Sequence, residues 1–360
     1  LMLAVAVLVV TCPCALSIAT PAAMLAAAGA LAKSGVLVRR LQALEVLATT
    51  DTLVFDKTGT LTTGRMALRQ VRTREGVSAD EALSLAGALA SHSLHPVSRA
   101  LVAASTQAAG IAFSDVQEHA GLGLLGQHVA VGEPPKTMSV RLGSAAWCGL
   151  ADDLRSQHQN ELERVVHLSD DKGWLASFEL SEELRRDAKD AVASLKAAGI
   201  DVHLLSGDHA ASVLKVAAQL EIAQATGGCT PNDKLSKVQA MQSQGRVVAM
   251  VGDGLNDGPV LAASSVSFAM GEGVPLAQAQ ADFVVQGQNL MVVALTVMQA
   301  RRCLKIVRQN LLWAVGYNLI CVPLAVSGLL TAWIAGLGMA LSSLLVVANA
   351  ARLSRKLISQ

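Results

Sequence analysis

Charge is missing from both ends of this 360-residue chain, because residues 1–32 and 309–351 contain no Asp, Glu, Lys or Arg. Aromatic residues are also scarce, at 3%, and only 16% of residues are charged, against 52% that are hydrophobic. This hydrophobicity excludes a disordered chain, and 29 basic against 28 acidic residues exclude a strongly basic nucleic-acid binder. The uncharged ends predict a membrane protein that contacts lipid and binds no nucleic acid.

The uncharged stretches are long enough for three membrane spans. A helix rises about 1.5 Å per residue and the hydrocarbon core is about 30 Å thick. The first stretch then makes one long span, residues 1–35, and the second makes two, 301–328 and 329–352, with a turn at Ser327 and Gly328. Basic residues follow the first apolar run, which argues against a secretory signal. The chain opens inside that run without an initiator Met, which suggests a fragment.

Basic residues flank all three spans on the same side. They are Lys33, Arg39 and Arg40 after the first, Arg301, Arg302, Lys305 and Arg308 before the second, and Arg352, Arg355 and Lys356 after the third. Because basic residues favour the cytoplasmic side, the middle region and the tail 353–360 are predicted to be cytoplasmic. The six cysteines are not expected to form disulfides in that reducing compartment.

Three apolar runs in the middle region, 51–55, 201–205 and 246–251, are typical of buried strands. Each ends at a cluster of Asp, Gly and hydroxyl residues, at 56–62, 206–208 and 252–259. Ligands of open parallel sheets bind beyond the carboxyl ends of the strands, so we expect one shared site. The insert 65–177 is long enough to be a second domain, which leaves 36–64 and 178–300 for the first.

The segment Asp-Lys-Thr-Gly-Thr-Leu-Thr at 56–62 is the most specific motif. An Asp at a strand end, followed by small residues whose backbone N–H groups can surround an anion, suits a carboxylate that attacks a phosphoryl group. Such an attack on a polyanion needs a cation and fixed donors around the transferred group. The alternative is an ordinary strand-to-turn connection with an Asp cap.

Together with Gly-Asp-Gly-Leu-Asn-Asp-Gly-Pro at 252–259, this motif resembles the P-type ATPases, and Ser93-Leu-His-Pro96 with Cys12-Pro13-Cys14 extends the resemblance to their heavy-metal (P1B-type) class. The resemblance implies α-helical transmembrane segments and a cytoplasmic α/β haloacid-dehalogenase-like phosphorylation domain with an inserted α+β nucleotide-binding domain. It implies a catalytic set with Asp56 as nucleophile, completed by Lys57, Thr58, Ser206, Gly207, Asp208, Lys234 and Asn256. It also implies a Mg²⁺ site of Asp56, the Thr58 carbonyl, Asp253 and Asp257. Ser206 stands where the family usually has Thr.

Two motifs of the insert are similar to the nucleotide-binding motifs of these pumps. His95 and Pro96 match a His-Pro pair in which the His holds adenine, although Leu94 replaces the usual Glu. Gly121 and Gly123 match a glycine loop that admits the nucleotide. They also fit Gly-x-Gly-x-x-Gly, but no clear strand precedes them and no convincing helix follows, as a dinucleotide fingerprint would require. A plain turn is the alternative.

The first span contains Cys12-Pro13-Cys14. Pro13 opens the helix so that both sulfurs can converge, and paired sulfurs favour Cu(I) or Zn²⁺ over hard ions. No acidic residue in the other spans could compensate a divalent charge, which favours monovalent Cu(I). Resemblance to copper pumps adds further ligands: Tyr317, Asn318, Met339 and Ser343. Chance cysteines and helix-packing polar residues are the alternatives.

The resemblance implies ATP and Mg²⁺ as cofactors and Cu(I), with Ag(I) as a surrogate, as the transported ion. It implies a multi-pass protein of a bacterial inner or plasma membrane, a copper chaperone or small Cu(I) donor, and an N-terminal actuator domain and spans that are missing here. We expect this segment alone not to complete the cycle. Leu94, Gly258 and 270–275 loosely resemble the subgroup that serves cytochrome oxidase assembly. Alternatives are a Zn²⁺ pump, a membrane-anchored phosphatase of the same fold and a metal-binding scaffold.

Overall fold

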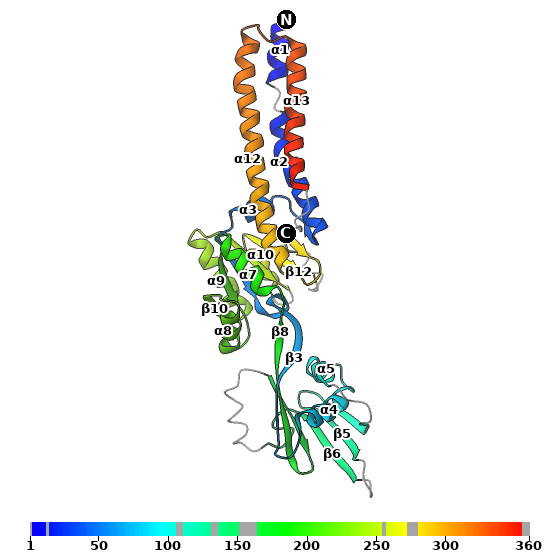
Figure 1. The fold of residues 1–360 in the computed structure, drawn as a ribbon. Coiled ribbons are helices and arrows are strands. Elements are labelled where there is room, and N and C mark those ends of the chain that lie inside the picture. Colours follow the sequence, from blue (N-terminus) through cyan, green and yellow to red (C-terminus); the bar gives the residue numbers. More distant parts are fainter. Residues whose placement is uncertain are drawn as a thin grey trace. The chain divides into compact units, whose positions relative to one another are not determined.

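The computed structural model describes residues 2–11, 14–105, 111–130, 136–150, 164–253, 257–271 and 280–354. The chain forms two compact units (Figure 1). Unit 1 comprises residues 1–61 and 185–360, and unit 2 comprises residues 62–184. The insert expected at 65–177 lies inside unit 2. Unit 2 is longer at both ends because its first strand begins at Thr62 and its last strand ends at Leu184.

Unit 1 is built on a seven-stranded sheet in the order β1-β13-β12-β11-β2-β9-β10. Its strands are β1 (Val36–Val38), β2 (Thr52–Asp56), β9 (Asp201–Leu205), β10 (Gln224–Thr226), β11 (Val248–Gly252), β12 (Val266–Met270) and β13 (Phe283–Val285). All neighbours are parallel except β1 and β13. Every residue of β2, β11 and β12 is buried, as expected of central strands covered on both faces. The register pairs Asp56 with Leu205 and Phe55 with Val251, so β2, β9 and β11 end at one edge.

Short helices connect these strands: α3 (Ala43–Thr49), α7 (Ala188–Ala197), α8 (Ala210–Gln219), α9 (Pro231–Ser243) and α10 (Gly258–Ala263). The start of α9 is fixed by a capping box, in which the Thr230 hydroxyl and the Asp233 carboxylate each accept a backbone N–H from the other residue. Pro231 supplies the preset backbone angle of a first helical residue. Lys234, the residue after Asp233, is thereby held at the first turn of α9.

Unit 2 is a six-stranded antiparallel sheet in the order β3-β8-β7-β6-β5-β4. Its strands are β3 (Thr62–Thr73), β4 (Phe113–His119), β5 (Gly123–Ala130), β6 (Lys136–Gly143), β7 (Arg164–Asp170) and β8 (Gly173–Leu184). Helices α4 (Ala79–Ala90) and α5 (Pro96–Ala104) pack against it through a core that includes Leu89, Leu101, Leu168 and Phe178. The predicted fold class, an α/β domain interrupted by an inserted α+β domain, is confirmed.

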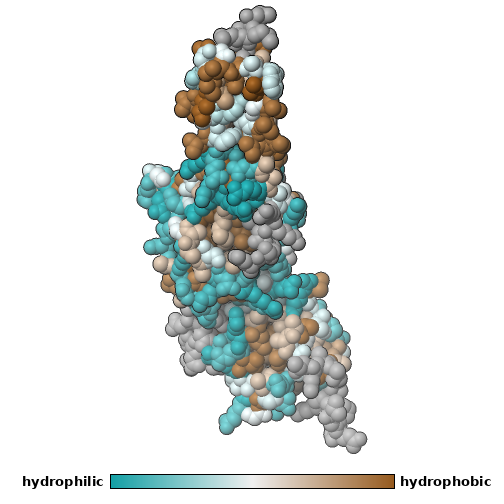
Figure 2. Space-filling model, turned by 45° about the horizontal axis from the view of Figure 1, so that its top comes forward, coloured by the Kyte–Doolittle hydropathy of each residue, from teal (hydrophilic) through white to brown (hydrophobic). Residues whose placement is uncertain are grey.

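Three helices in the described part of the chain are long and apolar enough to cross a membrane: Leu16–Lys33, Met291–Val326 and Ala332–Ser354. The second is α12 (Met291–Val326) and the third consists of α13 (Ala332–Ala351) and a short 3₁₀ turn. Between them, Ser327 and Gly328 form the turn where the sequence predicts it. Figure 2 shows hydrophobic residues over much of the visible face of these helices, and Leu312, Leu319, Leu329 and Trp333 are 72–75% exposed.

The first stretch contains two helices, α1 (Met2–Val10) and α2 (Cys14–Lys33), which flank Pro13 in the sequence, where we expect the helix to open. The start of the second long apolar helix differs from the sequence expectation. Helix α12 begins at Met291 rather than near 301. Its first turns are apolar because they are buried in unit 1, at Val292, Val293 and Val297, where α12 contacts α3 and α7. Its basic residues 301–308 therefore lie within a continuous helix rather than before it.

Candidate phosphoryl-transfer site

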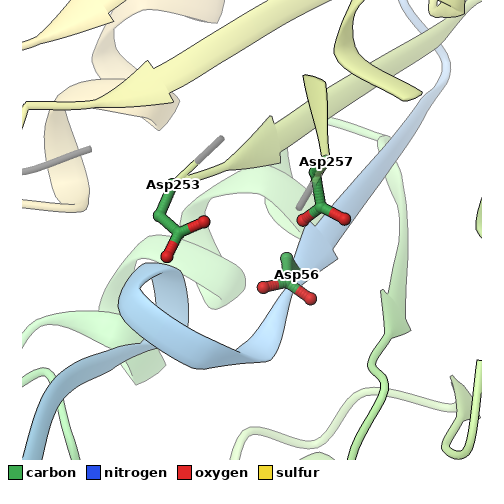
Figure 3. Close-up of side chains that lie close together, drawn as sticks. All are labelled: Asp56, Asp253 and Asp257. Carbon is green, nitrogen blue, oxygen red and sulfur yellow. The ribbon is translucent and has the colours of Figure 1, made fainter. Parts of the chain in front are cut away.

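Three carboxylates converge at the shared strand edge of unit 1 (Figure 3). Asp56 ends β2, Asp253 follows β11 and Asp257 immediately precedes α10. Oxygen atoms of the three lie within 4.8 Å of one another. Asp56 and Asp257 are only 6% and 2% exposed. The structure thus brings together the three side chains that the sequence assigned to Mg²⁺, whereas Asn256 lies outside the described residues.

Lys234 joins two of these carboxylates. Its Nζ atom donates to Asp56 Oδ1 at 2.6 Å and to Asp257 Oδ1 at 2.8 Å, and all three side chains are buried. Burial and the nearby charge of Asp257 raise the pKa of Asp56 to about 7, although Lys234 acts in the opposite direction. Burial lowers the pKa of Lys234, but the charges of Asp56 and Asp257 outweigh it and raise that pKa overall. One ammonium among three carboxylates leaves an excess of negative charge, which fits a divalent cation with oxygen ligands.

The turn after Asp56, residues 57–61, is shaped by a glycine. Gly59 has φ +71°, and a Cβ there would lie 2.7 Å from Asp253 Oδ2. Any side chain at Gly59 would therefore displace that carboxylate. The neighbouring Lys57 is buried and forms an ion pair with Asp208. This ion pair connects the cluster at 56–62 directly with the cluster at 206–208.

The Ser206-Gly207-Asp208 cluster lies at the same strand edge, because Leu205 is the register partner of Asp56. Ser206 is buried, its backbone N–H donates to the Thr226 carbonyl at 3.0 Å, and its hydroxyl accepts the N–H of Asp208 at 3.2 Å. This turn keeps Asp208 where it can reach Lys57. Arg185 is also buried against the turn after Asp56, but nothing in the local sequence pattern distinguishes it from Arg186.

In unit 2, the His-Pro loop is tied to the end of β4. Ser93 Oγ donates to Glu118 Oε1 at 2.9 Å and accepts the His95 N–H at 3.2 Å. His95 caps the start of α5, where its Nδ1 accepts the Val97 N–H at 3.3 Å and Pro96 is the first helical residue. The loop is therefore held beside the strand that leads to Gly121, while Leu94 is 81% exposed.

The expectation that no strand precedes the glycines is wrong. Strand β4 does precede them, but only about every third residue of it is partly buried, which hides the alternation typical of strands. Gly121, with φ +74°, lies in the turn of the β4–β5 hairpin, and Gly123 begins β5. A Cβ on Gly123 would lie 2.2 Å from the Leu142 carbonyl oxygen, so close packing of β6 also requires this glycine. A strand follows instead of a helix, which excludes the dinucleotide fingerprint.

In the membrane helices, the structure brings Tyr317 of α12 close to the turn of α13 that carries Met339. A Cβ on Gly338 would lie 2.9 Å from the Tyr317 hydroxyl. One turn away, Trp313 Nε1 donates to Ser342 Oγ at 3.1 Å, which fixes the register of the two helices. Asn318 and Ser343 follow Tyr317 and Ser342 in the sequence. Cys12 lies outside the described residues, and Cys14 is the first residue of α2.

A largely parallel sheet with a buried Asp at the carboxyl end of a central strand is an arrangement suited to covalent catalysis by a carboxylate. Residues 50–264 match the haloacid dehalogenase-like hydrolases. The chain belongs to that family.

Within that family, the relatives and solved structures that the chain matches indicate a narrower class, the heavy-metal P-type ATPases. The chain is 36% identical over 357 residues to a copper-exporting P-type ATPase of Mycobacterium leprae, covering 97% of this chain and 44% of that protein. It is 41% identical over 355 residues to nitrogen fixation protein FixI of Rhizobium leguminosarum, covering 98% and 45%. A zinc-transporting PIB-type ATPase crystal structure in the E2.Pi state has 31% identity and a TM-score of 0.85, covering 96% and 57%. The chain spans about half the length of the curated relatives it matches.

Proposed function

We propose that this chain carries the catalytic centre of an ATP-driven Cu(I) pump, in which Asp56 is transiently phosphorylated. The observation that carries the proposal is the buried position of Asp56 against Lys234, beside Asp253 and Asp257. An Oδ atom of Asp56 attacks the γ-phosphorus of ATP, the bond to the bridging oxygen breaks, and ADP leaves with that electron pair. Bound Mg²⁺ would neutralise phosphate oxygens at the three carboxylates and promote this displacement.

The residues around Asp56 have distinct parts in this step. Lys234 offsets the repulsion between the attacking carboxylate and the incoming phosphate, since its ammonium lies 2.6 Å from Asp56. The ion pair of Lys57 with Asp208 holds the turn after Asp56 against the Ser206 turn. Backbone N–H groups of the small residues in both turns are suited to the phosphate oxygens. In unit 2, His95 and the turn at Gly121 are proposed to hold the adenine end of ATP.

Two observations support Cu(I) as the transported ion. The sulfurs of Cys12, Cys14 and Met339 are soft ligands, and residues 309–351 offer no carboxylate to a divalent ion. Tyr317, Asn318 and Ser343 complete the proposed path. Relatives named as copper-exporting pumps agree with this assignment, whereas the solved structure named above transports zinc. Lipid, a copper donor and additional segments of the same pump are its proposed partners, with unit 2 and the sheet of unit 1 in the cytoplasm.

A phosphatase of the same fold is the second candidate. Hydrolysis of an aspartyl phosphate is fast when a second Asp two residues after the nucleophile activates water, and here that position is Thr58. Without that second Asp, we expect the phosphoenzyme to be long-lived, which favours the pump over the phosphatase.

Labelled ATP distinguishes these functions. In lipid or detergent, with Mg²⁺ and Cu(I), the chain should form an acid-stable phosphoprotein that decays slowly after a chase. Asp56→Asn should abolish the label. Equal labelling of Asp56→Asn contradicts the mechanism, and rapid turnover with free phosphate release favours the phosphatase.

Cu(I) titration tests the membrane site without ATP. Cys12→Ser with Cys14→Ser should remove high-affinity Cu(I) binding. Gly338→Ala should weaken it roughly tenfold, because the new methyl group would lie 2.9 Å from the Tyr317 hydroxyl and displace that proposed ligand. Gly336→Ala is the matched control, since a Cβ there meets no atom within 4 Å. Unchanged affinity in the cysteine variant refutes the proposed site.

A further inference from the structure

Arg185 is a buried side chain, 5% exposed, that contacts the turn after Asp56. Its Nε donates to the Thr60 carbonyl at 2.7 Å, and its Nη2 donates to the Gly59 carbonyl at 2.8 Å. Its backbone N–H also donates to the Leu61 carbonyl at 2.9 Å. Arg185 therefore binds three successive carbonyl groups of the turn after Asp56, which we call the catalytic turn.

The same guanidinium reaches the segment that leads into α12. Its Nη1 donates to the Gln288 carbonyl at 2.9 Å, three residues before α12 begins at Met291. A guanidinium is a planar fork whose donors keep fixed relative directions, so its contacts to Gly59, Thr60 and Gln288 move together. A displacement of the catalytic turn is thus passed to residue 288 without an intervening flexible side chain.

A second side chain strengthens the connection to α12. Asp187 Oδ2 accepts the backbone N–H of Met291 at 2.8 Å. The first N–H groups of a helix have no partner within the helix, and a carboxylate there also interacts favourably with the helix dipole. Arg185 and Asp187 are two residues apart, so the segment between unit 2 and α7 holds both the catalytic turn and the start of α12.

Helix α12 also contacts the ends of α7 and α3. Arg301 donates to the carbonyl of Ala198, which follows α7, and to the Thr50 carbonyl, at 3.2 Å for the latter. The first turns between these points are buried against unit 1. Because the helix continues unbroken from Met291 to Val326, a shift of its first turn relative to Arg301 changes the direction of the part that carries Tyr317.

We propose that Arg185 is a positioning residue that couples the turn after Asp56 to the first turn of α12, so that phosphorylation at Asp56 alters the membrane helix. The proposal depends on the function proposed above, namely that Asp56 is phosphorylated. Phosphorylation adds a doubly charged group beside Asp253 and Asp257, and the turn that contains Gly59 lies against Asp253. Arg185 transmits the response of that turn to Gln288.

The test compares the native chain with Arg185→Lys, Arg185→Gln and Arg186→Gln, all in lipid or detergent. Arg186 is the matched control because it is the adjacent arginine and its side chain is exposed. Two quantities are measured on each protein: the fraction labelled by ATP with Mg²⁺, and the amide hydrogen exchange of residues 288–294 with and without labelling. The second is a difference within one protein, so a purely structural loss of stability does not produce it.

In the native chain and in Arg186→Gln, labelling should change the exchange rate of residues 288–294 about tenfold, which corresponds to about 1.4 kcal/mol. Arg185→Lys should be labelled to within about threefold of native, yet lose most of that change, because a single ammonium cannot hold three carbonyls in a fixed arrangement. Arg185→Gln should lose it entirely.

The outcomes are distinguishable. A native chain that takes up no label overturns the proposed function and this inference together. Normal labelling without any change at 288–294, or a full change in Arg185→Lys, overturns the coupling and leaves the proposed function standing. A folded Arg185→Lys protein that is not labelled also overturns the coupling, since Arg185 would then serve the chemistry at Asp56 instead.

Discussion

Replacement of Lys234 by Met removes the ammonium that lies between Asp56 and Asp257. Its Nζ is 2.6 Å from one carboxylate and 2.8 Å from the other, and all three groups are buried. Breaking a buried ion pair typically costs about 3–5 kcal/mol, because the remaining charge is left without a partner. We expect a loss of that size in the free energy of opening around β2 and β11 at pH 8, in the absence of Mg²⁺.

The loss should depend on pH in a definite direction. A raised carboxyl pKa destabilises the folded state progressively as pH rises from the ordinary value of 3.8 to the folded value of about 7, and the penalty is constant above that pH and absent below 3.8. For native Asp56, an increase from 3.8 to about 7 amounts to roughly 4 kcal/mol above pH 7. This net penalty already includes the favourable effect of Lys234, which stays charged throughout because its own pKa is raised. Lys234→Met should therefore destabilise much less at pH 5, where Asp56 is neutral, than at pH 8.

Amide hydrogen exchange of β2 and β11 at the two pH values measures this difference. Lys237→Met is the control, because Lys237 lies on the same helix α9 and its Nζ donates to the Thr226 hydroxyl at 3.5 Å rather than to the carboxylates of the site. It should cost less than about 1 kcal/mol at either pH. An equal loss at pH 5 and pH 8, or a loss no larger than that of Lys237→Met, refutes the assignment of Lys234 as the counter-charge of Asp56.

Two further predictions concern Gly59 and Cys148. Gly59→Ala should raise the Mg²⁺ concentration needed for half-maximal phosphorylation by labelled ATP about tenfold or more, since its methyl group would lie 2.7 Å from Asp253 Oδ2. Gly64→Ala is the control, because Gly64 has a similar φ of +69° with no atom within 4 Å of a Cβ, and equal effects of the two substitutions would implicate backbone strain instead. Cys148 should react with iodoacetamide about a hundredfold more slowly than an ordinary thiol at pH 8, because burial raises its pKa to about 11; mass spectrometry of the modified peptide measures this rate, and ordinary reactivity would show that the site opens readily.

The convergence of Asp56, Asp253 and Asp257 could be predicted from the sequence because it follows from topology. Each carboxylate comes just after an apolar run, and parallel strands place their carboxyl ends at one edge. The contact of Lys57 with Asp208 was not predicted, although both residues were assigned to the site, since their pairing depends on the shape of two turns. Asn256 and Cys12 remain predictions, because the structure does not describe them.

Other features could not be predicted because their partners carry no sequence signal. Arg185 binds backbone carbonyls, which every residue possesses, so nothing in the sequence indicates its contacts. The early start of α12 was missed because span length was judged from the uncharged stretch, whereas its first turns are buried in protein rather than in lipid. Strand β4 was missed because one exposed strand at the edge of a sheet shows little alternation.

The two crossings between the units are adjacent to each other. Thr62 and Leu184, the first and last residues of unit 2, are register partners on neighbouring strands, and Leu61 accepts a hydrogen bond from Arg185. An inserted segment with neighbouring ends can be removed without stretching its host, and a linker of a few residues can close the gap. Unit 2 is in this sense an exchangeable module: residues 62–184 can be replaced as one piece, while the carboxylate site and the long apolar helices keep their own sequence.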